Sequence, residues 1–289
     1  MSALIKNSGG NRSFINNSTG SVTVDCISLS ENGTNRTLTM SGTNDTLVSG
    51  VVSDGSSTAS NLTKTGTGNL TLSGANTYNG ATNVNAGTLT IAHNTALGTT
   101  TGSTTVASGA ELSLTNGISV AENITNNGTV ANTSGSNTLS GVVSGTGAVD
   151  VDGGTLTLTG ANTYSGGTTV AGSSTLQIGS GATTGSLTGN ITNSGTVDFN
   201  RSNTYSYGGV ISGSGGVDQT GSGTTTLTSA QTYTGDTDIT AGTLQLSGSG
   251  RLADTTAVTV TSPGTFDLNN VTDTVAPFPA DQAPVQPVS

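Results

Sequence analysis

Two pairs of aspartates have a spacing that could support chemistry. Asp150 and Asp152 lie two residues apart, and so do Asp236 and Asp238. On a β-strand, each pair would present two carboxylates to one face, about 7 Å apart. That separation suits the acid and base of glycoside hydrolysis, or a Ca²⁺ ion. No lysine or arginine lies near either pair in the sequence, and the calcium-binding pattern G-G-x-G-x-D is absent. We therefore expect solvent-facing aspartates and predict no metal site.

Nucleophilic catalysis has few candidate residues here. A serine triad would need His93, the only histidine, and the sequence has no G-x-S-x-G nucleophile elbow. We expect His93 to lie on the surface near a turn. Cys26, the only cysteine, excludes an intramolecular disulfide and a thiolate metal cluster. Since it alternates with Val22 and Val24, we expect a buried small hydrophobic side chain, and we predict no catalytic residue and no cofactor.

Five tyrosines divide into two groups. Tyr78, Tyr164 and Tyr233 recur at one position of a repeated phrase. They could stack on sugars if exposed, or plug the corner of a coil and hydrogen-bond through the hydroxyl if buried. We favour the buried role, because several coils separate them. Tyr205 and Tyr207 flank one serine and point to one face of a strand, so we predict that they form an exposed aromatic contact.

The composition limits the folds that could position these residues. Thr, Gly, Ser and Asn make up 167 of the 289 residues, while 8% are charged and 3% aromatic. These residue types are poor helix formers, which excludes a helical bundle. A disordered chain remains, as does a β structure that needs few apolar residues per unit length. The formal net charge is −10.

Nucleic-acid binding requires clustered cations that neutralise phosphates. The basic residues are spread along the chain, at Lys6, Arg12, Arg36, Lys64, Arg201 and Arg251. We therefore predict no nucleic-acid partner. No apolar stretch approaches the roughly 20 residues of a membrane helix, so we also predict no membrane insertion by this segment.

Internal repeats favour an ordered β structure over disorder. Three segments, 70–91, 156–178 and 225–246, share short alternating strands, a tyrosine, and a β-branched residue six positions after that tyrosine. The middle copy has one extra residue before Leu176, which a turn tolerates and a strand does not. Gly and Asn punctuate the strands every few residues.

Strands with two or three inward residues cannot fill a two-sheet sandwich, but they can line a narrow coil. Successive coils would stack at about 4.8 Å, with Leu, Val and Ile inside and Thr, Ser and Asn outside. The pattern therefore predicts an all-β, right-handed parallel β-solenoid (β-helix) over residues 1–275, with unpaired strand edges at its ends.

Residues 276–289 differ from the repeats in composition. They contain four of the five prolines, which cannot donate to a β-ladder, so we predict a short, extended, Pro-rich C-terminal arm. The residues that we expect to serve as an assembly arm are Pro277, Phe278, Pro279, Pro284 and Pro287.

The phrase L-T-L-[ST]-G-A-N-T-Y-x-G-x-T-x-V, followed by A-G and T-L, resembles the passenger-associated repeat of bacterial autotransporters. The first two copies match closely, and the third has Ser229 and Gln231 in place of Gly and Asn. The resemblance implies a β-helical, type V secreted surface protein. Such proteins begin with a signal peptide and end in a membrane barrel, and neither pattern is visible here, so we expect a passenger fragment or a free-standing protein that uses the repeat.

Three functions follow from these observations. We predict a non-enzymatic structural or adhesive β-solenoid of a bacterial surface, extracellular or cell-surface, acting as a stalk, an adhesin or a fibre subunit joined head to tail through the arm. Its partners would be further copies of the chain and possible surface glycans. The alternative is a polysaccharide-binding or -cleaving β-helix of the lyase or phage-tailspike type, and a disordered linker comes third.

Overall fold

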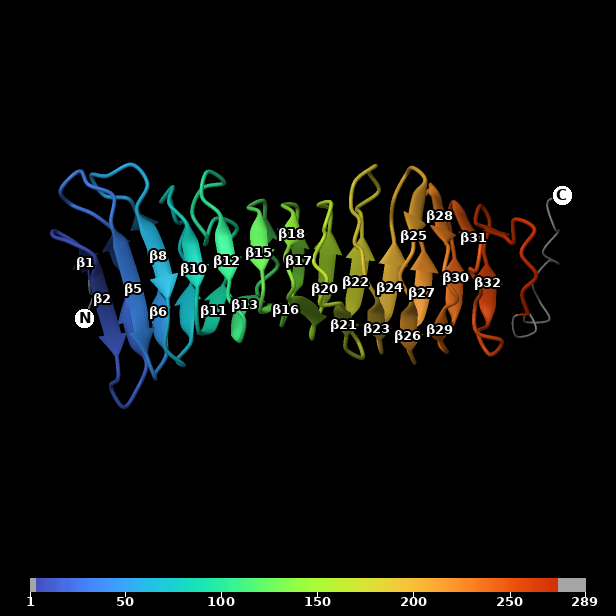
Figure 1. Cartoon of the computed structure of the whole chain (residues 1–289), viewed down its shortest axis with the longest axis horizontal. Coiled ribbons are helices and arrows are strands. Elements are labelled where there is room, and N and C mark those ends of the chain that lie inside the picture. Colours follow the sequence, from blue (N-terminus) through green and yellow to red (C-terminus); the bar gives the residue numbers. More distant parts are fainter. Residues whose placement is uncertain (1–3, 275–289) are drawn as a thin grey trace. The chain divides into compact units, whose positions relative to one another are not determined.

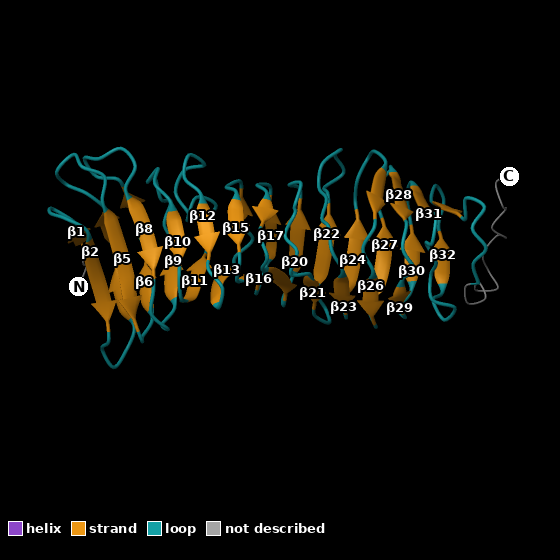
Figure 2. Ribbon diagram, in the orientation of Figure 1, coloured by secondary structure: helices purple, strands orange, loops and turns teal. Residues whose placement is uncertain are grey.

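The computed structural model describes residues 4–274. These residues form 33 short β-strands joined by turns, and Figure 2 shows strands and loops without a helix in this range. Every strand pairing is parallel, and the fold is an all-β parallel solenoid of about 13 turns. The chain divides into two compact units, Met1–Ala148 and Val149–Ser289. The prediction of an all-β parallel solenoid is confirmed, while its right-handed sense and its expected boundary at residue 275 stay predictions.

The strands form because small β-branched and apolar residues alternate. Strand β5 (Thr37–Gly42) shows the pattern most clearly, since its side chains are half-buried and buried in strict alternation. Leu38 and Met40 point into the coil and Thr37 and Thr39 point out. One apolar residue in every two is enough to build the core, because each coil covers the inward residues of the coil below it.

The first unit contains four parallel ladders. Their strand orders are β1-β4-β7, β2-β5-β8-β10-β12-β15-β18, β3-β6-β9-β11-β13-β16 and β14-β17. Figure 1 shows the strands of the second of these ladders, blue to green, following one another in this order. The strand bounds are β1 Leu4–Lys6, β2 Arg12–Asn16, β3 Val22–Val24, β4 Cys26–Ser28, β5 Thr37–Gly42, β6 Thr46–Val48, β7 Val52–Ser53, β8 Asn61–Lys64, β9 Leu70–Leu72, β10 Thr82–Val84, β11 Gly87–Ile91, β12 Thr104–Val106, β13 Ala110–Leu114, β14 Ser119–Val120, β15 Ile124–Asn126, β16 Thr129–Asn132, β17 Ser136–Leu139 and β18 Val143–Ser144.

The second unit contains three parallel ladders. Their orders are β19-β21-β23-β26-β29, β20-β22-β24-β27-β30-β32 and β25-β28-β31-β33. The strand bounds are β19 Ala148–Val151, β20 Thr155–Leu158, β21 Thr168–Val170, β22 Thr175–Ile178, β23 Ile191–Asn193, β24 Thr196–Phe199, β25 Tyr205–Tyr207, β26 Ile211–Gly213, β27 Gly216–Gln219, β28 Thr224–Leu227, β29 Thr232–Tyr233, β30 Thr237–Ile239, β31 Thr243–Leu246, β32 Val258–Val260 and β33 Thr265–Asp267.

The core of each unit is a set of stacked apolar columns. In the first unit, Leu70 lies below Leu89, which lies below Leu112 and then Val130. All four side chains are at most 1% exposed. Burying one such side chain contributes about 1.5–3 kcal/mol, so a column of a single side chain per coil holds successive coils together.

Turns between the strands absorb changes in spacing. The extra residue of the middle repeat falls in the turn at Ser173, which has a φ of 69°, between β21 and β22. Leu176 still lies directly above Leu156 in the parallel ladder. The insertion therefore changes the turn and leaves the strand register intact, as predicted.

Candidate functional site

The repeated tyrosines close the corners between two faces of the coil. Each hydroxyl lies within hydrogen-bond distance of the threonine hydroxyl four residues later, at 2.6 Å for Tyr78–Thr82, 2.7 Å for Tyr164–Thr168 and 2.6 Å for Tyr233–Thr237. All three tyrosines are 0% exposed, and burial raises the pKa of each. The predicted buried role is therefore the observed one, and these rings are not available to a ligand.

An amide two residues before each tyrosine ties neighbouring coils together. Asn76 Oδ1 accepts a hydrogen bond from the backbone N–H of Val52 at 2.8 Å, and its Nδ2 donates to the carbonyl of Ala96 at 2.6 Å. In the third copy, Gln231 Oε1 accepts from the backbone N–H of Ile211 at 2.7 Å. The replacement of Asn by Gln in this copy thus keeps the bond to the preceding coil.

Two strands precede each tyrosine corner in the sequence and two strands follow it. The two that follow stack on the two that precede. Thr82 lies above Leu62, and Leu89 lies above Leu70, so one repeat contains a complete step from coil to coil. A family model for the passenger-associated-transport-repeat matches residues 62–91, 149–178 and 217–246, which are the three segments built in this way. The chain is therefore similar to this repeat at three places, over 90 of its 289 residues.

A curated protein is similar over a longer stretch. The chain is 40% identical over 189 residues to a protein described as "Adhesin BmaC autotransporter" from Brucella suis biovar 1 (strain 1330). The match covers 64% of this chain and 6% of the length of the adhesin. No solved structure matches the chain. The repeats and this similarity make the chain autotransporter passenger-like, and such a passenger is surface-exposed or secreted.

Tyr205 and Tyr207 do not form the exposed contact that we predicted. They are 8% and 1% exposed, because β25 has the opposite phase and the serine between them faces outward. Their rings lie 6.2 and 5.9 Å from the ring of Phe199. The Tyr205 hydroxyl donates to the carbonyl of Leu187 at 2.9 Å. The prediction was wrong, and both tyrosines belong to an aromatic core.

Asp150 and Asp238 lie in strands β19 and β30, and Asp152 and Asp236 lie just outside these strands. Asp152, Asp236 and Asp238 are exposed and Asp150 is half-buried. Burial and the neighbouring Asp152 raise the pKa of Asp150, and no cation contributes to that shift. Among residues 4–274, no group of three or more His, Cys, Asp or Glu side chains is arranged to hold a metal ion.

Stacking creates a carboxylate ladder that sequence spacing did not indicate. Asp198, Asp218 and Asp238 face one another on β24, β27 and β30, one per coil. The Thr220 hydroxyl donates to Asp198 Oδ1 at 2.6 Å. Burial, and then the charges of Asp198 and Asp238, raise the pKa of Asp218 to about 6. These three residues form the carboxylate ladder of the second unit.

His93 and Cys26 have no catalytic surroundings. The backbone N–H of Thr95 donates to His93 Nδ1 at 3.2 Å, a local bond within a turn. Cys26 is half-buried rather than buried, and it pairs with the exposed Leu4. The chain turns a corner at Asp25, between ladders β3-β6 and β4-β7, so the alternation that began at Val22 does not continue to Cys26. The prediction of a buried cysteine was therefore wrong.

One buried carboxylate was missed by the sequence reasoning. Glu122 is 4% exposed, and its Oε1 accepts a hydrogen bond from the Thr104 hydroxyl at 2.8 Å. Its Oε2 is buried and has no hydrogen-bond partner. Desolvation raises the pKa of Glu122 to about 7. Because Glu122 lies in the coil after Thr104, no local spacing signals their contact.

Glu122 lines a surface cavity of about 480 Å³ in the first unit. Three corner segments of successive coils form its walls, residues 75–77, 94–100 and 119–122. The volume lies within the range of small-ligand sites. We call this hollow the corner cavity.

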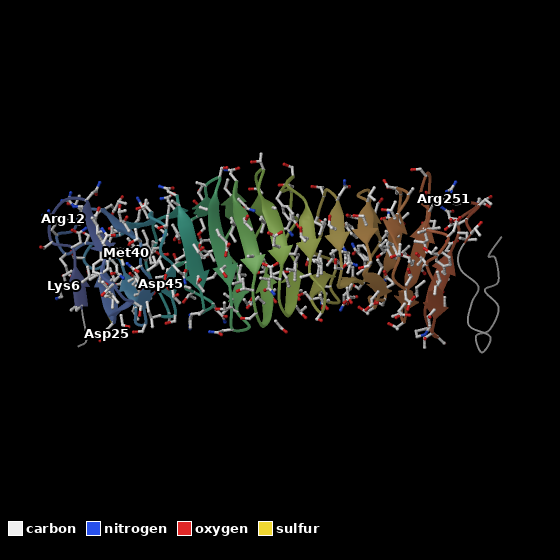
Figure 3. All side chains as sticks on the ribbon, turned by 90° about the horizontal axis from the view of Figure 1, so that it is seen from below. Lys6, Arg12, Asp25, Met40, Asp45 and Arg251 are labelled. Atoms are coloured by element: carbon white, nitrogen blue, oxygen red, sulfur yellow. The ribbon has the colours of Figure 1, made fainter. Side chains whose placement is uncertain are left out.

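The remaining predictions concern other parts of the chain. Pro277, Phe278, Pro279, Pro284 and Pro287, the predicted assembly arm, lie outside the described residues. Figure 3 shows Lys6 and Arg12 among the first strands of the first unit, and Arg251 among the last strands of the second. The described part of the chain has no helix with the length and hydropathy needed to cross a membrane.

Proposed function

We propose that this chain is a non-enzymatic stalk segment of an adhesive bacterial surface protein. One observation carries the proposal: the side chains that recur in the repeats make their polar contacts inside the fold, where they close corners and join neighbouring coils. Tyr78, its partner Thr82, and Asn76 are all buried, with their polar atoms bonded inside the fold. The repeated chemistry therefore builds a scaffold, and the outward faces remain free to vary. The similarity to an adhesin supports the same role.

The outward faces carry regular rows of hydroxyl and amide groups. A polar row at a spacing of about 4.8 Å can exchange hydrogen bonds with the hydroxyls of a surface glycan, which we propose as the binding partner. The outward residues of the β2-to-β18 ladder are Ser13, Thr39, Thr63, Asn83, Thr105, Thr125 and Ser144.

Adhesion by the isolated chain is measurable directly. Beads coated with the 289-residue chain are expected to bind cultured host cells more than beads coated with an unrelated acidic β-protein. Treatment of the cells with glycosidases is expected to lower this binding. Equal attachment of both bead types would reject the adhesive role, and attachment that survives glycosidases would reject the glycan as partner.

The finer proposal is that copies of this chain join end to end. At one end of the described region, β1, β2 and β3 each pair on one side only, which leaves a parallel edge for another coil. Leu4 and Ile15, at this edge, are 57% and 59% exposed. Such a heterologous contact does not close on itself and would give filaments.

Electron microscopy of the purified chain tests the filament. We expect rods whose lengths are multiples of one subunit, shortened by Ile15→Lys and by deletion of residues 276–289. Single particles of uniform length for the unmodified chain, at every concentration tried, would reject head-to-tail assembly without affecting the adhesion measurement.

A further inference from the structure

The corner cavity combines apolar walls with one ionisable group. Ala75, Leu97, Val120 and Ala121 contribute methyl and methylene groups to its lining. Glu122 is the only ionisable residue among the lining residues. An apolar hollow with one polar group favours a ligand that has an aliphatic body and one charged end.

The other polar side chain deep in the wall is already occupied. Asn76 is 2% exposed, and it uses its oxygen on Val52 and its nitrogen on Ala96. Glu122, by contrast, accepts a hydrogen bond from Thr104 through Oε1, and its Oε2 has no hydrogen-bond partner. This oxygen is itself buried beside the cavity, so the Glu122 side chain must rotate before a ligand can reach it.

A structural role does not account for a carboxylate at this position. Thr82, which lies directly beside Thr104 in the ladder, obtains its hydrogen bond from a neutral tyrosine hydroxyl. Desolvation acts against the charged form of Glu122, and no cation contributes to the shift in its pKa. A glutamine would satisfy Thr104 without burying a charge. Buried groups whose charged form is unfavourable are concentrated at functional sites.

We propose that the corner cavity binds the side chain of a lysine on a partner protein, with Glu122 as the counter-ion. The ammonium group meets Oε2 after rotation of the glutamate side chain, and the four-carbon stem packs against the exposed side chains of Ala75 and Ala121. Arginine fits less well, because its planar fork prefers two carboxylate oxygens and Oε1 is engaged by Thr104. The proposal rests on the adhesive role only for the claim that the lysine belongs to a partner.

Solution NMR on the full chain tests the cavity by itself. The probe is N-acetyl-lysine methylamide, compared with the arginine analogue and with the same compound acetylated on Nε. We expect saturable shifts at residues 94–100 and 119–122 for the lysine probe, with at least tenfold weaker binding of the other two compounds. Affinity should rise with pH through about 7, because only the ionised carboxylate attracts the ammonium group. The chain has three glutamates, so ¹³C-glutamate labelling resolves Glu122 directly.

Two variants and a control complete the experiment. Glu122→Gln keeps an acceptor for Thr104 and should weaken lysine binding at least tenfold. Ala121→Phe, at an exposed position, should fill the cavity and have the same effect while Glu122 still titrates. Glu31→Gln, at an exposed glutamate, should change nothing. Equal binding of the three probes, no saturable shift, or unchanged binding by Glu122→Gln would each overturn the proposal. Lysine binding with no attachment to cells would instead refute the adhesive role.

Discussion

Thr82 and Thr104 occupy adjacent positions of one parallel ladder, and their hydroxyls are satisfied in two different ways. Thr82 is bonded to Tyr78, four residues earlier in the same coil. Thr104 donates to Glu122, which comes from the next coil. The tyrosine corner is neutral and fully buried, whereas the glutamate corner holds a titratable group with one unpartnered oxygen.

The comparison separates stability from binding. The tyrosine recurs in three corners of this chain, so it is the part that the repeat uses to close its corners. The glutamate corner occurs beside one of them and lines the corner cavity. If this distinction is correct, changes at the tyrosine affect stability at every pH, and changes at the glutamate affect stability only where it is ionised.

The largest effect is expected from Tyr78→Ala. Removing a fully buried aromatic ring leaves a cavity between coils and should lower the free energy of unfolding by about 3–5 kcal/mol. Urea unfolding followed by circular dichroism measures this loss. A change below about 1 kcal/mol would show that the corner repacks and that the tyrosine is not the structural element of the comparison.

The second effect is a pH dependence that belongs to Glu122. Its pKa in the fold is about 7, above the ordinary 4.5, so the folded state holds the proton more tightly than the unfolded chain. The contribution of Glu122 to stability is therefore greatest below about pH 4.5 and falls as the pH rises to 7, by at most about 3 kcal/mol. Urea unfolding at a series of pH values should show this fall in the native chain and a flatter profile in Glu122→Gln. Identical profiles would contradict the assignment.

A smaller effect is expected when only the tyrosine hydroxyl is removed. Tyr78→Phe keeps the ring and leaves Thr82 without its 2.6 Å partner, which should cost about 1–2 kcal/mol. The double variant Tyr78→Phe/Thr82→Val should lose less stability than the two single variants lose together, because both changes remove the same hydrogen bond. A double-mutant cycle in urea measures this coupling, and strict additivity would mean that the hydrogen bond contributes nothing.

The smallest effect is expected in the carboxylate ladder. Like charges directly opposite one another are unfavourable, so Asp218→Asn should raise stability at pH 7 by about 0.5–1 kcal/mol. The pKa of Asp218 in the fold, about 6, lies above the ordinary 3.8, so the fold favours its protonated form. Below about pH 4 this aspartate is protonated in both the folded and the unfolded chain, and the gain in stability from Asp218→Asn should disappear. Asp254→Asn, at an exposed aspartate outside the ladder, is the matched control. A gain that is independent of pH would exclude charge repulsion as its cause.

Repeats and alternation predicted most of the fold. They predicted the parallel all-β coil, the corner position of Tyr78 and the turn that absorbs the insertion near Ser173, because each depends on residues close together in the sequence. Alternation failed where the chain changes face. Cys26 follows a corner, and Tyr205 and Tyr207 occupy a strand whose phase could not be fixed from one serine.

The contacts that depend on stacking could not be predicted in the same way. Glu122 meets Thr104 across a coil boundary, and Asp198 faces Asp218 only because two coils share a register. Coil length varies by a residue or more between neighbours, so the residue that lies above another is undetermined until every turn has been placed. The coil spacing therefore decides the chemistry of the outer face.

The two repeats of the second unit differ in the faces that they occupy. Segment 149–178 uses the β19-to-β29 and β20-to-β32 ladders. Apart from the two-residue strand β29, segment 217–246 uses the β20-to-β32 and β25-to-β33 ladders. A genetic crossover between these similar stretches would delete the residues between them and still leave an intact corner. Every strand after the crossover would then lie one face earlier around the coil. Recombination at these repeats would thus turn the downstream surface to a new direction without redesigning the core, so a lineage could vary what it displays by shortening the gene.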